Sequence, residues 1–125
     1  MKKVLFLIML LPLAVLAQPC KPYAEINGHS GTSEISLSEL SALTKFNVAG
    51  TCRGEKYYIT SYEFTMMQKN QPLSLAGWGY TISEKIRKAM ESAEPGTKIF
   101  FDLIHAKGPG GKVIDVAGIT LIIKK

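Results

Sequence analysis

Few residues in this chain have the types and spacing that catalysis requires. His105 and Asp102, in the segment DLIHA, are the only histidine and carboxylate close together in the sequence. Residues three apart on a strand point to opposite faces, so this pair does not predict a catalytic dyad. His29 lies in a polar stretch with no partner pattern. We expect an ordinary strand histidine at 105 and no catalytic role for either residue.

The serines, glycines and cysteines provide no further reactive motif. No serine lies in a GxSxG or SxxK arrangement that would activate its hydroxyl. The glycine run at 108–111 lacks the lysine and hydroxyl residue that complete a phosphate-binding loop. Two histidines and two cysteines without CxxC spacing do not indicate zinc. We predict no enzyme activity, no catalytic residue, no cofactor and no metal site.

The two cysteines, Cys20 and Cys52, are typical of a disulfide in an exported protein. A bond between them would close a loop of about thirty residues. In the chain-entropy model such a loop contributes roughly 3–4 kcal/mol. Two unpaired thiols are the alternative.

Trp78 and Tyr80 are the candidate partner-binding residues, because they stand between glycines in the segment LAGWGY. Exposed rigid rings give a large contact area for little ordering cost. In the alternative interpretation, Trp78 folds back and covers the core.

The N-terminus has the layout of a secretory signal. A basic start at 1–3 precedes the apolar run 4–17, and Gln18 follows Ala17. The run is shorter than a membrane span and contains Pro12, which argues against the alternative of an uncleaved anchor. Pro19 before Cys20 also argues against a lipoprotein. We expect residues 1–17 to be a signal peptide, residues 18–125 a single periplasmic or secreted domain, and no membrane span after cleavage.

The charge of the domain does not indicate nucleic acid as a partner. The whole chain has a formal net charge of +5. Removal of Lys2 and Lys3 leaves thirteen basic residues against ten acidic ones, or about +3. The basic residues are scattered, so they form no stripe that would follow a phosphate backbone.

The hydrophobic pattern predicts a mainly β domain with one packed α-helix. We expect a short strand at 22–28 that is closed by Asn27 and Gly28. One or two helical turns follow at 36–43, beginning at a capping box of Ser36 and Glu39. We expect a strand or irregular segment at 45–52. The clearest strand is 55–67, with Tyr58, Thr60, Tyr62, Phe64 and Met66 on one face. Pro72, Gly77 and Gly79 predict a long loop at 68–80.

The C-terminal part predicts a helix followed by a β-hairpin. Apolar residues recur at helical spacing over about 82–93, after a capping box of Thr81 and Glu84. Pro95 and Gly96 end this helix. The hairpin has strands at 97–106 and 113–124 around a glycine-rich turn in which Gly108, Gly110 and Gly111 adopt positive φ. Both strands carry apolar residues on both faces, as in the interior of a sheet.

This order of features resembles the C-terminal domain of GldM and PorM, periplasmic proteins of the Bacteroidetes gliding and type IX secretion machinery. The segment 59–64 resembles the family's VxSFxV strand. The segment 95–99 is similar to its PGD-K-hydrophobic motif, and 104–111 to its I-x-A-x-GPDG turn. The likeness covers roughly residues 33–124. Gly110 replaces the usual aspartate. We expect a stand-alone domain without the membrane helix and preceding domains that couple the family proteins to a motor.

The resemblance implies an immunoglobulin-like β-sandwich with an added helix, used for protein–protein contact in the periplasm. We therefore predict a non-catalytic interaction module of the bacterial envelope that binds through exposed strand edges and the Trp78 segment. Its partner would be an envelope or periplasmic protein, or a second copy in a homodimer. The alternatives are a small secreted enzyme or enzyme inhibitor, and a carbohydrate or peptidoglycan binder that uses Trp78, Tyr80 and Tyr62.

Overall fold

The computed structural model describes residues 20–68 and 70–125. The predicted signal peptide, residues 1–17, lies outside the described residues. The chain forms eight strands within the described part: β1 (Tyr23–Ile26), β2 (Thr32–Ile35), β3 (Phe46–Ala49), β4 (Tyr58–Gln68), β5 (Gln71–Trp78), β6 (Lys98–Lys107), β7 (Val113–Val116) and β8 (Ile119–Ile123). The helical elements are α2 (Leu37–Ser41), α3 (Glu84–Glu91) and a 3-10 turn, η1 (Pro109–Gly111).

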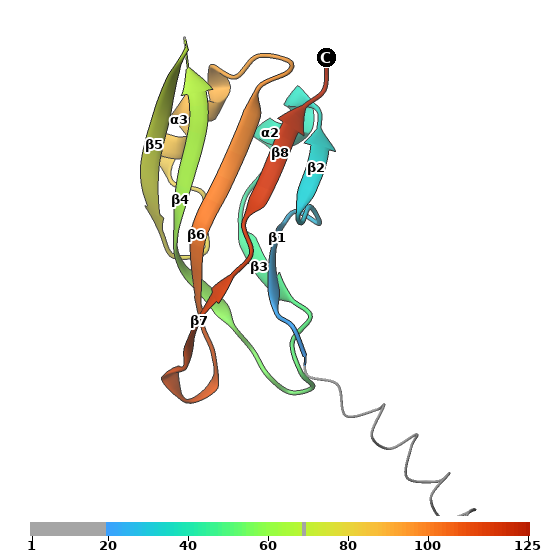
Figure 1. Cartoon of the computed structure of the whole chain (residues 1–125), viewed down its shortest axis with the longest axis vertical. Coiled ribbons are helices and arrows are strands. Elements are labelled where there is room, and N and C mark those ends of the chain that lie inside the picture. The colour runs from blue at the N-terminus through green and yellow to red at the C-terminus, as the bar shows by residue number, and fades with distance from the viewer. Residues whose placement is uncertain (1–19, 69) are drawn as a thin grey trace, which may run out of the picture.

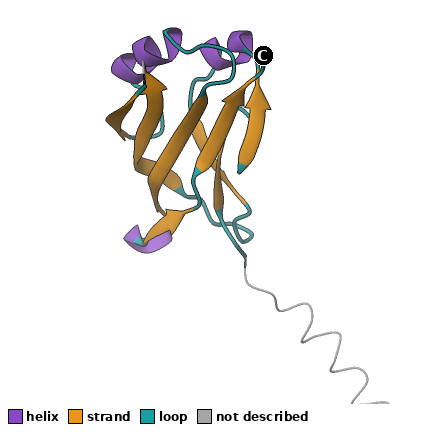
Figure 2. Ribbon diagram, turned by 45° about the horizontal axis from the view of Figure 1, so that its top comes forward, coloured by secondary structure: helices purple, strands orange, loops and turns teal. Residues whose placement is uncertain are grey.

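The strands form two sheets, which confirms a mainly β, sandwich-like fold (Figure 1). The larger sheet has the order β2-β8-β6-β4-β5, and β7 pairs with the second half of β6. Its pairs are antiparallel except β2 with β8, which is parallel. The smaller sheet is the antiparallel pair β1 and β3. The helices α2 and α3 lie at one end of the larger sheet, and η1 lies at the other end (Figure 2).

Aromatic rings join the two sheets through the core. Phe46 of β3 lies 4.6 Å from Tyr62 of β4 and 5.1 Å from Phe101 of β6, measured between ring centroids. All three rings are buried. Such tilted and edge-to-face pairs contribute about 0.5–1.5 kcal/mol beyond the area they bury.

The predicted face of β4 is correct only for its second half. Tyr62, Phe64 and Met66 are buried, but Tyr58 and Thr60 are exposed and Ile59 is buried instead. The register between β4 and β6 shifts twice, between Ile59 and Ser61 and again between Ser61 and Glu63. Such a bulge adds a residue to one strand and reverses the alternation of its side chains.

The long loop predicted at 68–80 is wrong, because Gln71–Trp78 is the edge strand β5. Pro72 is compatible with an edge strand, where the missing N–H faces solvent. Gly77 is required by packing rather than by a turn. A Cβ added at Gly77 would lie 2.1 Å from Cζ of Tyr62, whose ring covers this position.

The helices form near their predicted positions, with one error in capping. Ser36 and Glu39 form the expected capping box at α2. The helix α3 is shorter than 82–93, and its N-cap is Ser83, whose hydroxyl accepts a hydrogen bond from the N–H of Ile86. The predicted Thr81–Glu84 box is therefore wrong. The apolar pattern continued past the helix because Ile82 and Ala93 also pack against the core.

The C-terminal hairpin forms, but its second strand is divided. Segment 113–124 breaks at Gly118 into β7 and β8, which pair with opposite halves of β6. A Cβ at Gly118 would meet the carbonyl oxygen of Phe101 at 2.8 Å, so the break needs glycine. In the turn, Gly110 and Gly111 have positive φ as expected. Gly108 does not, and its requirement for glycine comes from the ring of Tyr57.

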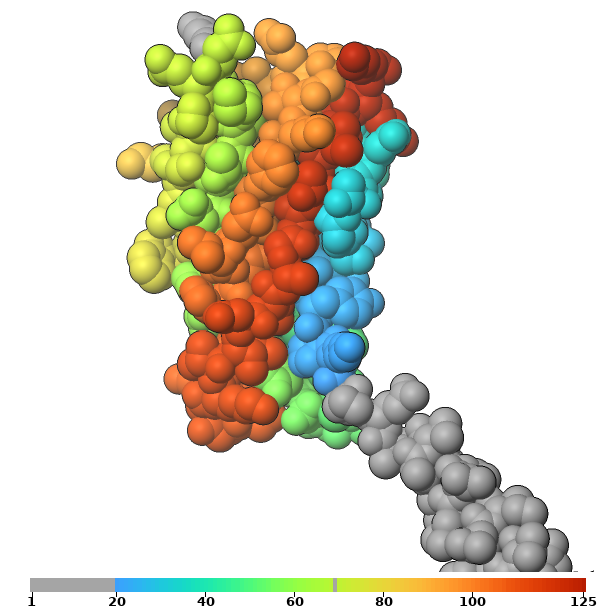
Figure 3. All heavy atoms as spheres, viewed as in Figure 1, coloured from blue at the N-terminus to red at the C-terminus, as the bar shows by residue number. Residues whose placement is uncertain are grey.

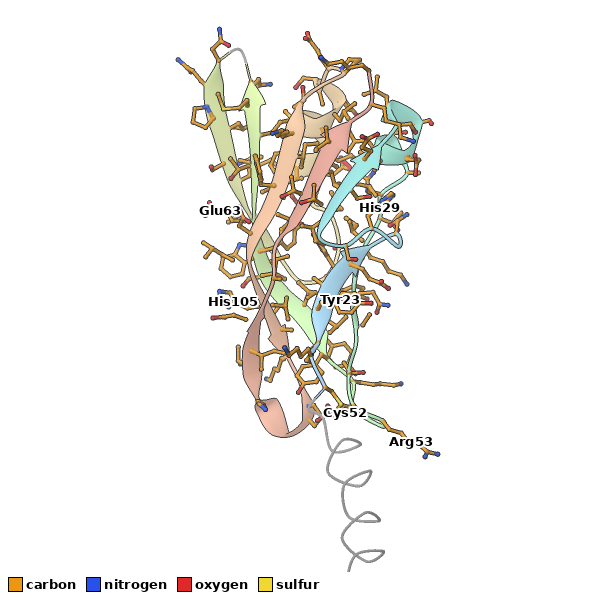
Figure 4. The ribbon with its side chains drawn as sticks, turned by 45° about the vertical axis from the view of Figure 1, so that its right-hand side comes forward. Tyr23, His29, Cys52, Arg53, Glu63 and His105 are labelled. Atoms are coloured by element: carbon orange, nitrogen blue, oxygen red, sulfur yellow. A yellow bond between two sulfur atoms is a disulfide. The ribbon has the colours of Figure 1, made fainter. Side chains whose placement is uncertain are left out.

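The predicted disulfide between Cys20 and Cys52 is confirmed, with 5.3 Å between the Cα atoms. Tyr23 pairs with Ala49 in the smaller sheet, and extending this register by three residues places the two cysteines opposite each other. The bond lies at the end of the molecule away from α2 and α3 (Figure 4). A two-stranded sheet is marginal alone, so the disulfide holds its open end.

Substituting Gly77→Ala should lower the free energy of unfolding by about 1–3 kcal/mol, because the new methyl overlaps the Tyr62 ring. Chemical denaturation measures the effect. The cost should shrink in a Tyr62→Ala background, where the ring is absent. An equal cost in both backgrounds would contradict the explanation.

The double substitution Cys20→Ser and Cys52→Ser should lower the free energy of unfolding by about 3–4 kcal/mol, since the sequence separation is 32 residues. Denaturation with and without reductant tests this. Reductant should destabilise the native chain to the level of the variant and leave the variant unchanged.

Candidate protein-binding surface

The outer face of the larger sheet carries one continuous row of side chains across four strands. Trp78 of β5 pairs with Ser61 of β4, Ser61 pairs with His105 of β6, and His105 pairs with Asp115 of β7. Residues opposite each other in a sheet share a face. Trp78 is 77% exposed, which excludes the interpretation that its ring covers the core. The strand β5, and not a loop, therefore presents this side chain.

His105 has a partner other than the one considered in the sequence. Its Nδ1 lies 2.5 Å from a carboxylate oxygen of Asp115, and both side chains are solvent-accessible. The prediction that Asp102 and His105 do not form a dyad is compatible with this contact. Asp115 lies directly opposite His105 on the neighbouring strand of the β6–β7 hairpin, so the hydrogen bond links the two strands on their open face.

Next to this row lies an acidic pair with an exposed apolar residue. Glu63 of β4 is directly opposite Asp102 of β6, and Ala76 of β5 is opposite Glu63. Glu63 and His105 project from the same side of the sheet (Figure 4). Leu103 is 66% exposed and has a φ of +49°, at the second shift in register. Like charges directly opposite repel each other, so this surface favours a cationic group placed between them.

Tyr80 is held by different contacts from Trp78. It follows Gly79, and its carbonyl oxygen accepts a hydrogen bond from the N–H of Phe46 at the start of β3. Its ring is half exposed. Tyr62, the third ring of the carbohydrate alternative, is buried, and its hydroxyl donates to the carbonyl of Thr81 at 2.8 Å. Burial raises the pKa of Tyr62. Tyr62 therefore cannot form part of an exposed sugar platform.

Three polar side chains converge near α2, a grouping that the sequence did not predict. The Nδ1 of His29 lies 2.7 Å from the hydroxyl of Ser33, and its Nε2 lies 3.4 Å from a carboxylate oxygen of Glu39. This has the residue types of a hydrolase triad. However, the other oxygen of Glu39 accepts from the N–H of Ser36 in the capping box. The hydrogen bonds thus tie β2 and the preceding turn to the N-terminus of α2.

The turn that carries His29 is an Asn-Gly hairpin. Ile26 and His29 exchange two backbone hydrogen bonds, at 2.9 and 2.8 Å, around Asn27 and Gly28, both at positive φ. The dipeptide was the signal for this turn in the sequence. The spacing of His29, Ser33 and Glu39 provided no such signal, because they come together only when β2 leads directly into α2.

A groove of about 360 Å³ lies between α2 and α3. Its lining includes the apolar residues Leu37, Leu40 and Met90 together with Arg87 and Glu91. Arg87 donates to the carbonyl oxygens of Ser41 and Leu43, at 3.3 and 2.9 Å, and so binds the C-terminal end of α2 to α3. None of the His29, Ser33 and Glu39 side chains lines this groove.

Within residues 20–68 and 70–125, no group of three or more His, Cys, Asp or Glu side chains is arranged to hold a metal ion. No helix in that part of the chain combines the length and apolar composition that crossing a membrane requires.

The fold and this surface define a disulfide-stabilised, sandwich-like β domain with an open sheet face. The GldM C-terminal domain family matches residues 21–124, and the chain belongs to that family. A comparison with the curated proteins finds no match. The resemblance inferred from the strand, helix and turn motifs is therefore confirmed, over a longer range than the motifs themselves cover.

The carboxylate of Glu39 should make stability depend on pH. Hydrogen bonds from the backbone N–H and the hydroxyl of Ser36, together with His29, lower the pKa of Glu39 in the folded state. The stabilisation that these contacts give the folded state is fully present above the ordinary pKa of glutamate. It is lost as pH falls through the lower pKa of the folded state. Glu39→Gln should have a lower free energy of unfolding than the native chain at neutral pH, and this difference should disappear in acid. Denaturation measured at neutral and acidic pH tests this, and a difference that stays constant would contradict it.

Proposed function

We propose that this protein is an exported, non-catalytic interaction module of the bacterial envelope, associated with a gliding or secretion assembly. The single observation that carries the proposal is the exposed Trp78 on a sheet face, in a chain of the GldM C-terminal domain family. Large rigid aromatic side chains dominate the energy of protein interfaces. The partner is an envelope or periplasmic protein, and the mechanism is recognition without turnover.

Three features of the molecule support an interaction role in an oxidising compartment. The disulfide between Cys20 and Cys52 suits the periplasm or the exterior, where such bonds persist. Trp78 and Leu103 are both largely exposed on the outer face, although apolar side chains of this size are normally buried. Glu63 and Asp102 lie opposite each other on the same face, and a basic group from a partner would relieve their repulsion.

The proposal predicts that the mature domain, residues 18–125, recovers one defined envelope protein in stoichiometric amounts from an envelope extract. Trp78→Ala should abolish recovery without changing the fold, because the ring makes little contact with the core. Leu37→Ala is the matched control, since Leu37 is 46% exposed and lies at the groove between α2 and α3. This variant should retain the partner.

Two outcomes would contradict the proposal. Recovery of no protein by the native domain would rule out an assembly role as stated. Loss of the partner in Leu37→Ala with retention in Trp78→Ala would move the binding site to the groove between the helices. Circular dichroism of each variant separates loss of binding from loss of folding.

A further inference from the structure

The edge of β5 lacks the protection that edge strands normally carry. Its residues, Gln71–Trp78, include no charged side chain. Exposed edges of native sheets are usually blocked by charge, proline or a bulge, because their free N–H and C=O groups pair with other strands. Two other strands of the larger sheet also have an unpaired side, but each is only four residues long and carries a charge, Glu34 in β2 and Asp115 in β7. In β5, Pro72 blocks one end and leaves the remainder open.

The direction of the free backbone groups follows from the pairing with β4. The N–H of Gly79 donates to the carbonyl oxygen of Thr60 at 2.7 Å, so these two residues are a hydrogen-bonded pair of the antiparallel ladder. Hydrogen-bonded and non-hydrogen-bonded pairs alternate along such a ladder. The backbone groups of Ser74, Ala76 and Trp78 therefore point away from β4. No described strand pairs with this side of β5, which forms a margin of the molecule (Figure 3).

The same alternation explains the position of Pro72. Pro72 is also one of the residues whose backbone groups point away from β4, so its missing N–H removes no hydrogen bond to that strand. The open edge is thereby limited to a ladder from Ser74 to Trp78, with Gly79 at positive φ just beyond it. The side chains of these three residues lie on the outer face with Glu63 and Ser61. An added strand would thus continue the outer surface described above.

We infer that the free edge of β5 accepts an extended segment of a partner protein as an added strand. That segment has a basic residue opposite Ala76 and an apolar residue two positions away, opposite Trp78. The inference rests on the proposed function, in that the partner is a protein, and it specifies the chemistry of the segment.

The need for a basic residue follows from the cross-strand row of Ala76, Glu63 and Asp102. An added residue opposite Ala76 would lie two strand spacings, about 9–10 Å, from Glu63. The methyl group of Ala76 leaves room for a lysine or arginine side chain to extend over it toward Glu63 and Asp102. The apolar residue follows from Trp78, because alternate side chains on a strand share a face and the indole needs an apolar cover.

A second copy of this chain fits the edge less well. Pairing β5 with β5 would provide no basic side chain opposite Ala76, because the strand contains none. The open ladder offers outward backbone groups on only three residues, which is also short for a stable dimer, since such interfaces bury about 1,200–2,000 Å². A heterologous strand can add both the charge and further contacts beyond the ladder.

Trp78 is the only tryptophan in the chain, so its fluorescence reports binding directly. The probe is a capped peptide of sequence TVTKTLTVT, and the control is TVTETLTVT, in which glutamate replaces the lysine. We expect a saturable change in Trp78 emission, with binding of the lysine peptide at least tenfold tighter. Ala76→Pro removes one outward N–H without touching the β4 side and should abolish binding.

Glu63→Gln keeps the edge intact and should reduce the tenfold preference for lysine to less than threefold. Glu34→Gln, on β2, is the matched control and should leave the preference unchanged. Equal binding of the two peptides, absence of binding by both, or full binding by folded Ala76→Pro would each overturn the inference. A concentration-dependent dimer in sedimentation that Ala76→Pro abolishes would overturn it in favour of a second copy.

The experiments distinguish failure of strand addition at β5 from failure of the proposed envelope role. If an envelope protein is lost by Trp78→Ala but retained by Ala76→Pro, the interaction role stands and strand addition is wrong. If the peptide binds as expected but no envelope protein is recovered, the edge accepts strands and the envelope role is wrong.

Discussion

The contact of Phe46 with Tyr62 and Phe101 is the constraint on which the rest of the fold depends. It is the point where a strand of the small sheet packs between rings of the large one, and it fixes the side chain of Tyr62 against β5. With Tyr62 in place, position 77 must be glycine. Close packing tolerates no added methyl there. The path of β5 and the exposure of Trp78 at its end therefore follow from the aromatic core.

The shifts in register between β4 and β6 determine which side chains lie on the outer face of the sheet. They allow Ile59 to turn inward while Ser61 and Glu63 stay outward, and they place Leu103 at positive φ in the middle of the sheet. Bulges commonly redirect side chains next to functional sites. The outer surface with Trp78, His105 and the acidic pair thus depends on irregular pairing in strands whose inner faces remain regular enough to fill the core.

The sequence predicted the features that depend on local pattern and missed those that depend on distant partners. The Ser36–Glu39 capping box, the Asn27–Gly28 turn and the cysteine pair were readable because each signal lies in the residues themselves. The strand β5 was missed because Gly77 looks like a turn residue until the Tyr62 ring is placed over it. His105 was assigned no partner because Asp115 approaches it only across the hairpin. Trp78 was found by residue type, but its place on a strand edge was not.

The strand β5 must leave an edge open for a partner strand and must also avoid pairing with unrelated chains. A long, uncharged edge would pair with any extended chain and promote aggregation. Pro72 and Gly79 restrict the open ladder to the residues from Ser74 to Trp78, which is too short to hold a strand by backbone pairing alone. Selectivity must then come from side chains on the neighbouring strand, where Glu63 lies beside the small Ala76, and from the indole of Trp78. The absence of charge in β5 itself is compatible with solubility because the charges that select a partner lie one strand inside the edge.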